Sequence, residues 1–134
     1  MDDLSQQAFM NHIGGAWVPS ATGRTAPNLN PADTSDVVGL FPVSDAEDAR
    51  RAVEAADAAF AAWRDTPISK RAAILFRAAQ YLEDHADAFA RELTREEGKG
   101  LNLAKDEVLR SAQTIRFYAC LLYTSDAADE GLGV

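Results

Sequence analysis

Helical periodicity dominates the chain from residue 44 to residue 119. Apolar side chains recur there mostly three or four residues apart, which places them along one face of a helix. This spacing predicts four helices, with a break at residues 83–85 between the second and the third. The four stripes consist of Ala46, Ala49, Val53, Ala56, Phe60 and Trp63; of Ala72, Leu75, Phe76, Ala79 and Leu82; of Ala86, Phe89, Ala90 and Leu93; and of Ala104, Val108, Ala112, Ile115 and Ala119.

Local signals predict where these helices begin and end. Ser44 followed by Glu47 is typical of a capping box, in which each side chain accepts a backbone N–H of the first turn. Pro67 suits the first position of the second helix, where its missing N–H costs nothing. Gly98 is predicted to end the third helix as a left-handed C-cap, and Asn102 to cap the fourth.

The first 43 residues show short extended runs between turns. Two such runs flank Gly14-Gly15, a pair that favours a tight β-hairpin turn. A second extended stretch begins near Thr25, and the polar residues 33–36 are expected to form a turn before a short apolar strand at 37–41. The chain is therefore predicted to be mostly helical, with an N-terminal β-hairpin and short strands.

Composition and charge exclude several functional classes. The 134 residues are 47% hydrophobic and 25% charged, which is ordinary for a globular protein. A net charge of -8 argues against binding to nucleic acid or anionic lipid, because both need clustered Lys and Arg. Charged residues interrupt every apolar stretch, so we expect neither a membrane span nor a secretory signal. A single cysteine forms no internal disulfide, which favours a cytoplasmic location.

The last fifteen residues, 120–134, depart from the helical pattern. The run CLLYTSDAADE at residues 120–130 matches the translation of a transposase adapter used in short-read sequencing libraries. Gly133-Val134 fit the continuation of that adapter after a variable index. We therefore expect residues 120–134 to be adapter-derived, as in a metagenomic sequence, and residues 1–119 to be the genuine part. The alternative is a natural C-terminal tail.

Few residues offer catalytic chemistry. Cys120 could be a nucleophile, but it lies in the adapter-like segment and is set aside. His12 and His85 are far apart in the sequence and lack clustered ligands, so surface positions are favoured over a metal site. Gly98-Lys99-Gly100 lacks the remaining residues of a phosphate-binding loop and fits a helix terminator better.

The remaining candidates also favour structural roles. Glu96 and Glu97 are adjacent, so on a helix they point in different directions, as at an ordinary solvated helix end. Trp17, Phe60 and Trp63 are interpreted as core residues. The sequence therefore assigns no catalytic, cofactor-binding or metal-binding residue.

Several segments together nevertheless resemble one family. HIGGAWVPSATGRT, the turn at Asn30-Pro31-Ala32, DARRAVEAADAAFAAWRDTP, RAAILFRAAQYLEDHADAFARELTREEGK and EVLRSAQTIRFYA occur in the order and spacing found in NAD(P)-dependent aldehyde dehydrogenases. The resemblance covers residues 9–119 and the N-terminal portion of that family. NPADTSDVVG and LTREEGK look most similar to enzymes that oxidise 2-oxoglutarate semialdehyde, also called 2,5-dioxopentanoate. In most members Lys-Pro follows the Gly-Lys, whereas Gly100-Leu101 stand here.

The resemblance implies an α/β enzyme, part of whose coenzyme-binding domain is formed by residues 1–119. In the family a Cys thiolate attacks a small aldehyde, hydride passes to NAD or NADP, and a Glu-activated water releases the acid. The family's catalytic and dinucleotide-binding residues come later than the portion matched here, so none is transferred to this chain. We expect the chain alone to be inactive, and the parent enzyme to be a homo-oligomer.

A second hypothesis comes from another class of protein. The chain could be a self-standing helical module whose acidic faces bind a basic partner. This hypothesis requires residues 120–134 to be natural and the helices to bury their stripes on one another.

Overall fold

The computed structural model describes residues 8–130, with side chains described through residue 122. These residues form two compact units. Unit 1 comprises the chain up to Arg64 together with Arg95–Gly98, and unit 2 comprises Asp65–Thr94 and the chain from Lys99 onward. Among residues 8–130, no helix combines the length and the apolar character that a membrane crossing needs.

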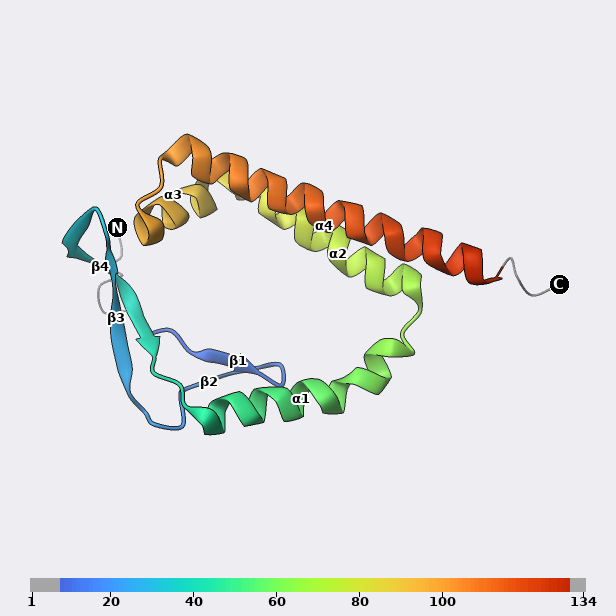
Figure 1. The fold of residues 1–134 in the computed structure, drawn as a ribbon, viewed down its shortest axis with the longest axis horizontal. Helices are drawn as coiled ribbons and strands as arrows, with labels where there is room; N and C mark the ends of the chain where they lie inside the picture. Colours follow the sequence, from blue (N-terminus) through green and yellow to red (C-terminus); the bar gives the residue numbers. More distant parts are fainter. Residues whose placement is uncertain (1–7, 131–134) are drawn as a thin grey trace. The chain divides into compact units, whose positions relative to one another are not determined.

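The predicted N-terminal hairpin is confirmed (Figure 1). β1 (Asn11–Ile13) and β2 (Ala16–Val18) pair antiparallel, with His12 opposite Trp17. The turn between them is Gly14-Gly15, whose φ angles are 60° and 82°. Residues with a Cβ rarely adopt positive φ, so the two glycines fix this tight turn.

β3 (Thr25–Asn30) and β4 (Asp33–Pro42) form a second antiparallel pair. The turn predicted at residues 33–36 is wrong, because β4 already begins at Asp33, which pairs with Asn30. The chain turns at Pro31-Ala32 instead, where the side-chain oxygen of Asn30 accepts the Ala32 N–H at 2.9 Å. This interaction closes the turn early and leaves residues 33–36 in the strand.

An aromatic ring covers the middle of β4. The rings of Phe9 and Phe41 are stacked with their centroids 4.5 Å apart. The Phe9 ring crosses Gly39, where a Cβ would overlap it. The Phe9 N–H also donates to the Leu40 carbonyl at 2.8 Å. Gly39 therefore lets the ring approach the strand, and the predicted strand at 37–41 is confirmed.

The N-terminus of α1 (Ala46–Arg64) is capped one residue later than predicted. Asp45 Oδ1 accepts the N–H groups of Glu47 at 2.9 Å and of Asp48 at 3.2 Å. Asp48 Oδ2 in turn accepts the Asp45 N–H at 3.4 Å. These bonds form a reciprocal capping box from two aspartates, so the predicted Ser44–Glu47 box is wrong. The Ser44 hydroxyl instead accepts a bond from the Asn11 amide at 2.8 Å.

Asp48 also joins α1 to the turn at residues 20–23. Its two carboxylate oxygens lie 2.9 and 3.0 Å from the Ala21 nitrogen and accept its N–H. Asp48 is only 2% exposed, and Ser20 in the same turn is also buried. The buried carboxylate thus satisfies backbone donors from two segments that are far apart in the sequence.

Replacing Asp48 by Ala is expected to lower the free energy of unfolding of unit 1 by about 1–3 kcal/mol. The N–H groups of Ala21 and Asp45 would lose their acceptor in a place that water reaches poorly. Glu54→Ala, at an exposed position of the same helix, is the matched control and should change stability by less than about 0.5 kcal/mol. Hydrogen exchange at the Ala21 amide measures the effect, and equal exchange in both variants would contradict it.

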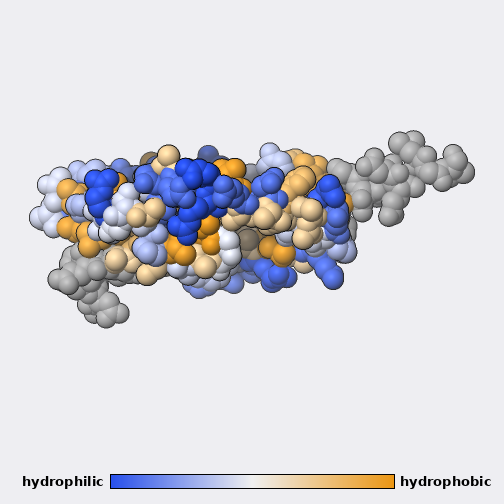
Figure 2. Space-filling view, turned by 90° about the horizontal axis from the view of Figure 1, so that it is seen from below, coloured by the Kyte–Doolittle hydropathy of each residue, from blue (hydrophilic) through white to orange (hydrophobic). Residues whose placement is uncertain are grey.

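The apolar stripe of α1 is open to solvent. Val53, Phe60 and Trp63 are 68%, 58% and 46% exposed, and Trp17 on β2 is 70% exposed. The interpretation of Trp17, Phe60 and Trp63 as core residues is therefore wrong for this chain. The reason is that α1 meets the β1–β2 hairpin along a different line, where Ala55 lies beside Gly14. Apolar surface is open in several places on the face drawn in Figure 2.

In unit 2, α2 (Ile68–Asp84) and α4 (Leu101–Glu130) lie side by side (Figure 1). The predicted inner faces are confirmed, since the most enclosed residues are those of the predicted stripes. Ala72, Ala79, Ala104, Ala112 and Ala119 are fully buried, and Val108 is nearly so. No larger side chain is fully buried among the described residues. The two helices therefore pack through alanines, which lets their backbones approach closely.

The ends of the helices in unit 2 follow the sequence signals in part. The predicted break is confirmed at His85, which ends α2 before α3 (Ala86–Glu97) begins. Pro67 precedes the first helical residue instead of occupying it. The Gly100 carbonyl accepts the Ala104 N–H at 3.0 Å, so α4 begins ahead of Asn102, and the predicted cap is wrong.

The backbone of α4 continues as a helix through Glu130, into the segment predicted to be adapter-derived. Leu121 is 41% exposed and Leu122 is half-buried. The side chain of Tyr123 lies outside the described residues.

Candidate functional site

The three residues with the strongest catalytic potential lie apart from other reactive groups. His12 is exposed and its ring meets that of Trp17 edge-on, with the centroids 4.8 Å apart. His85 is exposed and stacks on Tyr81 at 4.1 Å. Cys120 is exposed on α4. Within the described part of the chain, no three His, Cys, Asp or Glu residues are grouped so as to hold a metal ion.

The Gly98-Lys99-Gly100 segment is a helix terminator, as the sequence favoured. Gly98 has a φ of 73° and ends α3, which confirms the predicted C-cap. Lys99 forms an ion pair with Glu107 of α4, and the Gly100 carbonyl accepts the first hydrogen bond of that helix. The lysine charge and the carbonyl are thus already used within the protein.

Glu96 and Glu97 are both exposed at the end of α3. Glu96 accepts a hydrogen bond from the Asn28 amide at 3.2 Å, which links this helix end to β3. The pair therefore lies at a helix terminus, as the sequence favoured.

The most elaborate polar site is one that sequence reasoning missed. Arg95 donates to both carboxylate oxygens of Asp36, at 2.8 and 2.5 Å, and to the Val37 carbonyl at 3.0 Å. The Asn30 amide donates to the same carboxylate at 3.1 Å. We call Asn30, Asp36 and Arg95 the Asp36 cluster. A bidentate guanidinium–carboxylate pair has a defined geometry as well as charge, so the cluster fixes the end of α3 on the β3–β4 pair.

A glycine completes this contact. At Gly98 a Cβ would stand 3.2 Å from the Pro31 side chain, in addition to the strain of a positive φ. The hairpin turn and the end of α3 therefore approach closely because residue 98 has no side chain. The arrangement fits a structural joint, and its charged groups already satisfy one another.

The Asp36 cluster is expected to be sensitive to acid. The hydrogen bond from Arg95, followed by that from Asn30, lowers the pKa of Asp36 from 3.8 to about 2. A lowered folded-state pKa means that the stabilisation is complete above pH 3.8 and is lost as the pH falls towards about 2.

Arg95→Leu should therefore return the pKa of Asp36 towards its ordinary value and remove this part of the acid dependence. Titration of the Asp36 carboxyl carbon by NMR measures the shift. Arg91→Leu, at an exposed position of the same helix, is the control and should leave the pKa of Asp36 low. An unchanged pKa in Arg95→Leu would contradict the assigned cause.

A second charged contact lies within unit 2. Arg116 of α4 donates to the two Glu83 oxygens of α2 at 3.0 and 2.6 Å, and to the Gln80 side chain at 2.8 Å. The Arg116 hydrogen bond lowers the pKa of Glu83. This contact fixes the register of α2 against α4 beside the alanine packing.

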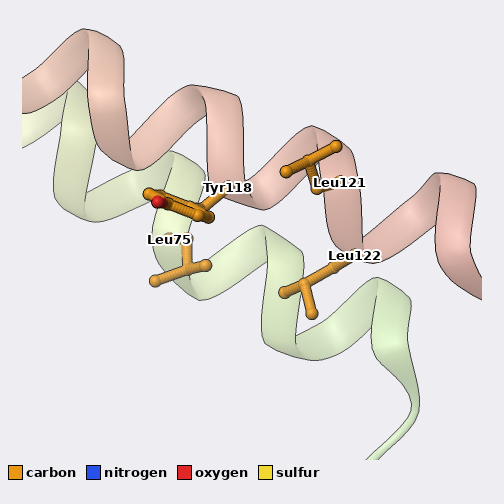
Figure 3. Close-up of a pocket in the computed structure, with 4 residues that line it drawn as sticks. All are labelled: Leu75, Tyr118, Leu121 and Leu122. Carbon is orange, nitrogen blue, oxygen red and sulfur yellow. The ribbon is translucent and has the colours of Figure 1, made fainter.

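An apolar pocket of about 240 Å³ lies between α2 and α4 (Figure 3). Leu75 lines it from α2, and Tyr118, Leu121 and Leu122 line it from α4. These side chains offer one phenol hydroxyl and otherwise hydrocarbon, with no group that would hold a phosphate or a metal. Two of the four residues also belong to the adapter-like segment.

The polar contacts described above join structural elements to one another. Asp36, Arg95 and Asp48 are the residues with the most specific polar contacts, and none was singled out from the sequence. A weak signal existed for Asp48, which stands three residues after Asp45 in a run that begins a helix.

Comparison with known proteins gives a consistent picture. A model described as "Aldehyde dehydrogenase family" matches residues 17–130, a range that overlaps the adapter-like segment. Malonate-semialdehyde dehydrogenase 2 of Geobacillus kaustophilus is 43% identical over 113 residues, which cover 84% of this chain and 23% of that protein. Alpha-ketoglutaric semialdehyde dehydrogenase of Bacillus subtilis is 40% identical over 114 residues, covering 85% of this chain and 23% of that protein.

A solved structure agrees with these sequence matches. An NAD-dependent benzaldehyde dehydrogenase from Corynebacterium glutamicum is similar with a TM-score of 0.80 and 32% identity. The similarity covers 85% of this chain and 25% of that one. The chain spans about a quarter of the length of the proteins it matches.

Proposed function

Because this chain belongs to the aldehyde dehydrogenase family, we propose that it is the N-terminal segment of an enzyme that oxidises an aldehyde to a carboxylic acid with NAD or NADP. The observation that carries the proposal is the 43% identity over 113 residues to a semialdehyde dehydrogenase. Since the matched part is 23% of that protein, the activity is assigned to a longer polypeptide. The proposal includes a homo-oligomeric, cytoplasmic enzyme.

The substrate class that we propose is a semialdehyde, a small aldehyde that also carries a carboxylate. The two relatives described above are named for malonate semialdehyde and for alpha-ketoglutaric semialdehyde. Alpha-ketoglutaric semialdehyde is the substrate that the sequence resemblance favoured. Malonate semialdehyde belongs to the same class of substrate and has a shorter carbon skeleton.

In this proposal residues 8–119 supply architecture and not chemistry. The two basic side chains nearest Gly98 are already paired, Lys99 with Glu107 and Arg95 with Asp36, which supports this proposal. The glycines around Lys99 end one helix and begin another. We therefore assign no catalytic step and no cofactor contact to these residues.

The hypothesis of a self-standing acidic module is less well supported. It requires the four helices to bury their apolar stripes on one another, whereas Val53, Phe60 and Trp63 of α1 are exposed. The family match also accounts for the order of the elements without a basic partner.

We also propose that residues 120–134 are adapter-derived, on the strength of the CLLYTSDAADE match. Sequencing the genomic locus tests both proposals. The reading frame is expected to continue past codon 119 into a Pro-Trp-Asn motif and later into a glycine-rich segment with a cysteine. A stop codon after Val134 in genomic DNA would overturn both.

The purified chain is expected to reduce neither NAD nor NADP in the presence of malonate semialdehyde, and to bind neither nucleotide in calorimetry. The reason is that the resemblance places the family's catalytic and dinucleotide-binding residues after the matched portion, and that Lys99 and Arg95 beside Gly98 are paired with carboxylates. Cys120→Ser should behave identically. Micromolar binding of either nucleotide would contradict the architectural role.

A further inference from the structure

A buried hydrogen-bond donor without an acceptor lies near the start of α2. The Nε atom of Arg71 is buried and has no hydrogen-bond partner among the described residues. The side chain as a whole is half-buried. Other cations of unit 2 have carboxylate partners, Glu83 for Arg116 and Asp87 for Lys105. Since buried N–H groups are paired in nearly all folded proteins, an acceptor for Arg71 is to be expected.

Arg71 lies on the side of α2 that meets α4. It stands four residues before Leu75, so the two residues share one face of the helix. Leu75 lines the pocket that Leu122 lines from α4 (Figure 3). The helices run antiparallel, because residue numbers fall along α2 and rise along α4 from the Glu83–Arg116 contact to this pocket. A helical side chain also leans towards the N-terminus of its helix. Arg71 therefore faces the stretch of α4 that follows residue 119.

That stretch of α4 belongs to the segment that we propose to be adapter-derived. Residues 120–125 are Cys-Leu-Leu-Tyr-Thr-Ser and include neither Asp nor Glu. The pocket of about 240 Å³ lies at the same place, whereas the earlier part of the α2–α4 contact is closed by fully buried alanines. An unfilled space and a donor without an acceptor thus coincide where α4 enters the segment. Both are expected where the side chains of one helix are not matched to the other.

The chemistry of Arg71 defines the acceptor. The backbone carbonyls of a continuing helix are used by its own hydrogen bonds, so α4 can offer acceptors from side chains. A carboxylate matches the planar guanidinium group in both charge and geometry. Unit 2 already uses this match, since Arg116 of α4 donates to both carboxylate oxygens of Glu83. An amide or a hydroxyl group would leave the charge of a half-buried arginine uncompensated.

We propose that Arg71 is paired, in the parent enzyme, with an aspartate or a glutamate encoded within the first six codons after Ala119. The ion pair joins the start of α2 to the natural continuation of α4. The proposal rests on the proposed function and on the adapter origin of residues 120–134, and it names the type of residue that the adapter replaced.

The genomic reading frame beyond codon 119 is the first test. A codon for Asp or Glu is expected among codons 120–125. A frame that continues into the rest of the enzyme with no acidic residue in these six codons would overturn this proposal and leave the proposed function standing. A stop codon after Val134 would overturn both.

Variants of the full-length enzyme encoded at that locus test the contact itself. Arg71→Gln and the amide variant of the acidic residue should each shorten the half-life of activity at a fixed elevated temperature about fivefold. The double variant should lose no more than either single variant, because all three remove the same ion pair. Lys70→Gln removes the neighbouring exposed charge and should leave the half-life unchanged. Losses that multiply in the double variant, or an Arg71→Gln enzyme as durable as Lys70→Gln, would overturn the proposal.

Discussion

A chimeric enzyme is expected to be active when residues 8–119 of this chain replace the matching segment of the Geobacillus kaustophilus malonate-semialdehyde dehydrogenase 2. The two segments are 43% identical, and the fold of this chain is similar to that of a solved benzaldehyde dehydrogenase with a TM-score of 0.80. A segment that supplies architecture should therefore be exchangeable. We expect turnover of malonate semialdehyde within about tenfold of the parent enzyme, which corresponds to a rise of at most about 1.4 kcal/mol in the activation barrier.

Two comparisons make this experiment decisive. The parent enzyme without the segment is expected to be inactive, because its remaining elements lose their packing partner. A chimera that folds and binds nucleotide but does not oxidise the aldehyde would contradict the architectural role of residues 8–119.

The position of the junction tests the adapter interpretation separately. One chimera keeps this chain to residue 119 and the other keeps it to residue 130, where the family match ends. If residues 120–130 are adapter-derived, the second chimera should be less stable and less active than the first. Equal activity would show that these residues are compatible with the enzyme.

The sequence predicted the elements of this fold better than their ends. Periodicity identified all four helices, because the spacing of Ala72, Ala79, Ala104 and Ala112 directly reflects the packing of α2 on α4. The ends depend on single hydrogen bonds, such as those of Asp45 and Asp48 at α1. Ser44 and Glu47 matched the usual capping pattern equally well, so the pattern alone gave the wrong box.

Burial was harder to predict than periodicity. An apolar stripe indicates that a helix has a partner, but it does not say whether the partner lies in the same chain. α2 and α4 cover each other, whereas α1 leaves Val53, Phe60 and Trp63 exposed. The stripes of α1 and α2 both follow helical spacing, so the spacing alone did not indicate which helix would be covered.

The Asp36 cluster shows a further limit of sequence reasoning. Asp36 and Arg95 are separated by 59 positions and bind each other through a bidentate ion pair. Neither residue belongs to a motif with a known chemistry, and the polar run around Asp36 is equally typical of a turn. A contact of this kind becomes visible when both segments are placed in space.

Ala79→Leu is expected to destabilise the packing of α2 on α4 by about 1–3 kcal/mol. Ala79 is fully buried, and the alanines of α4 that face α2, such as Ala112, are fully buried as well. A leucine side chain at position 79 adds three carbons where no space is open, so the helices must separate or the side chain must adopt a strained rotamer. Intrinsic helix propensity changes little between Ala and Leu, so the effect reports packing.

The neighbouring residue provides a matched control for this change. Ala78 is exposed on the same helix, and Ala78→Leu should change stability by less than about 0.5 kcal/mol. Urea unfolding followed by helical dichroism measures both variants at one protein concentration. If Ala79→Leu were as stable as Ala78→Leu, the two helices would not be in close contact through their alanines, and the core of unit 2 would have to lie elsewhere.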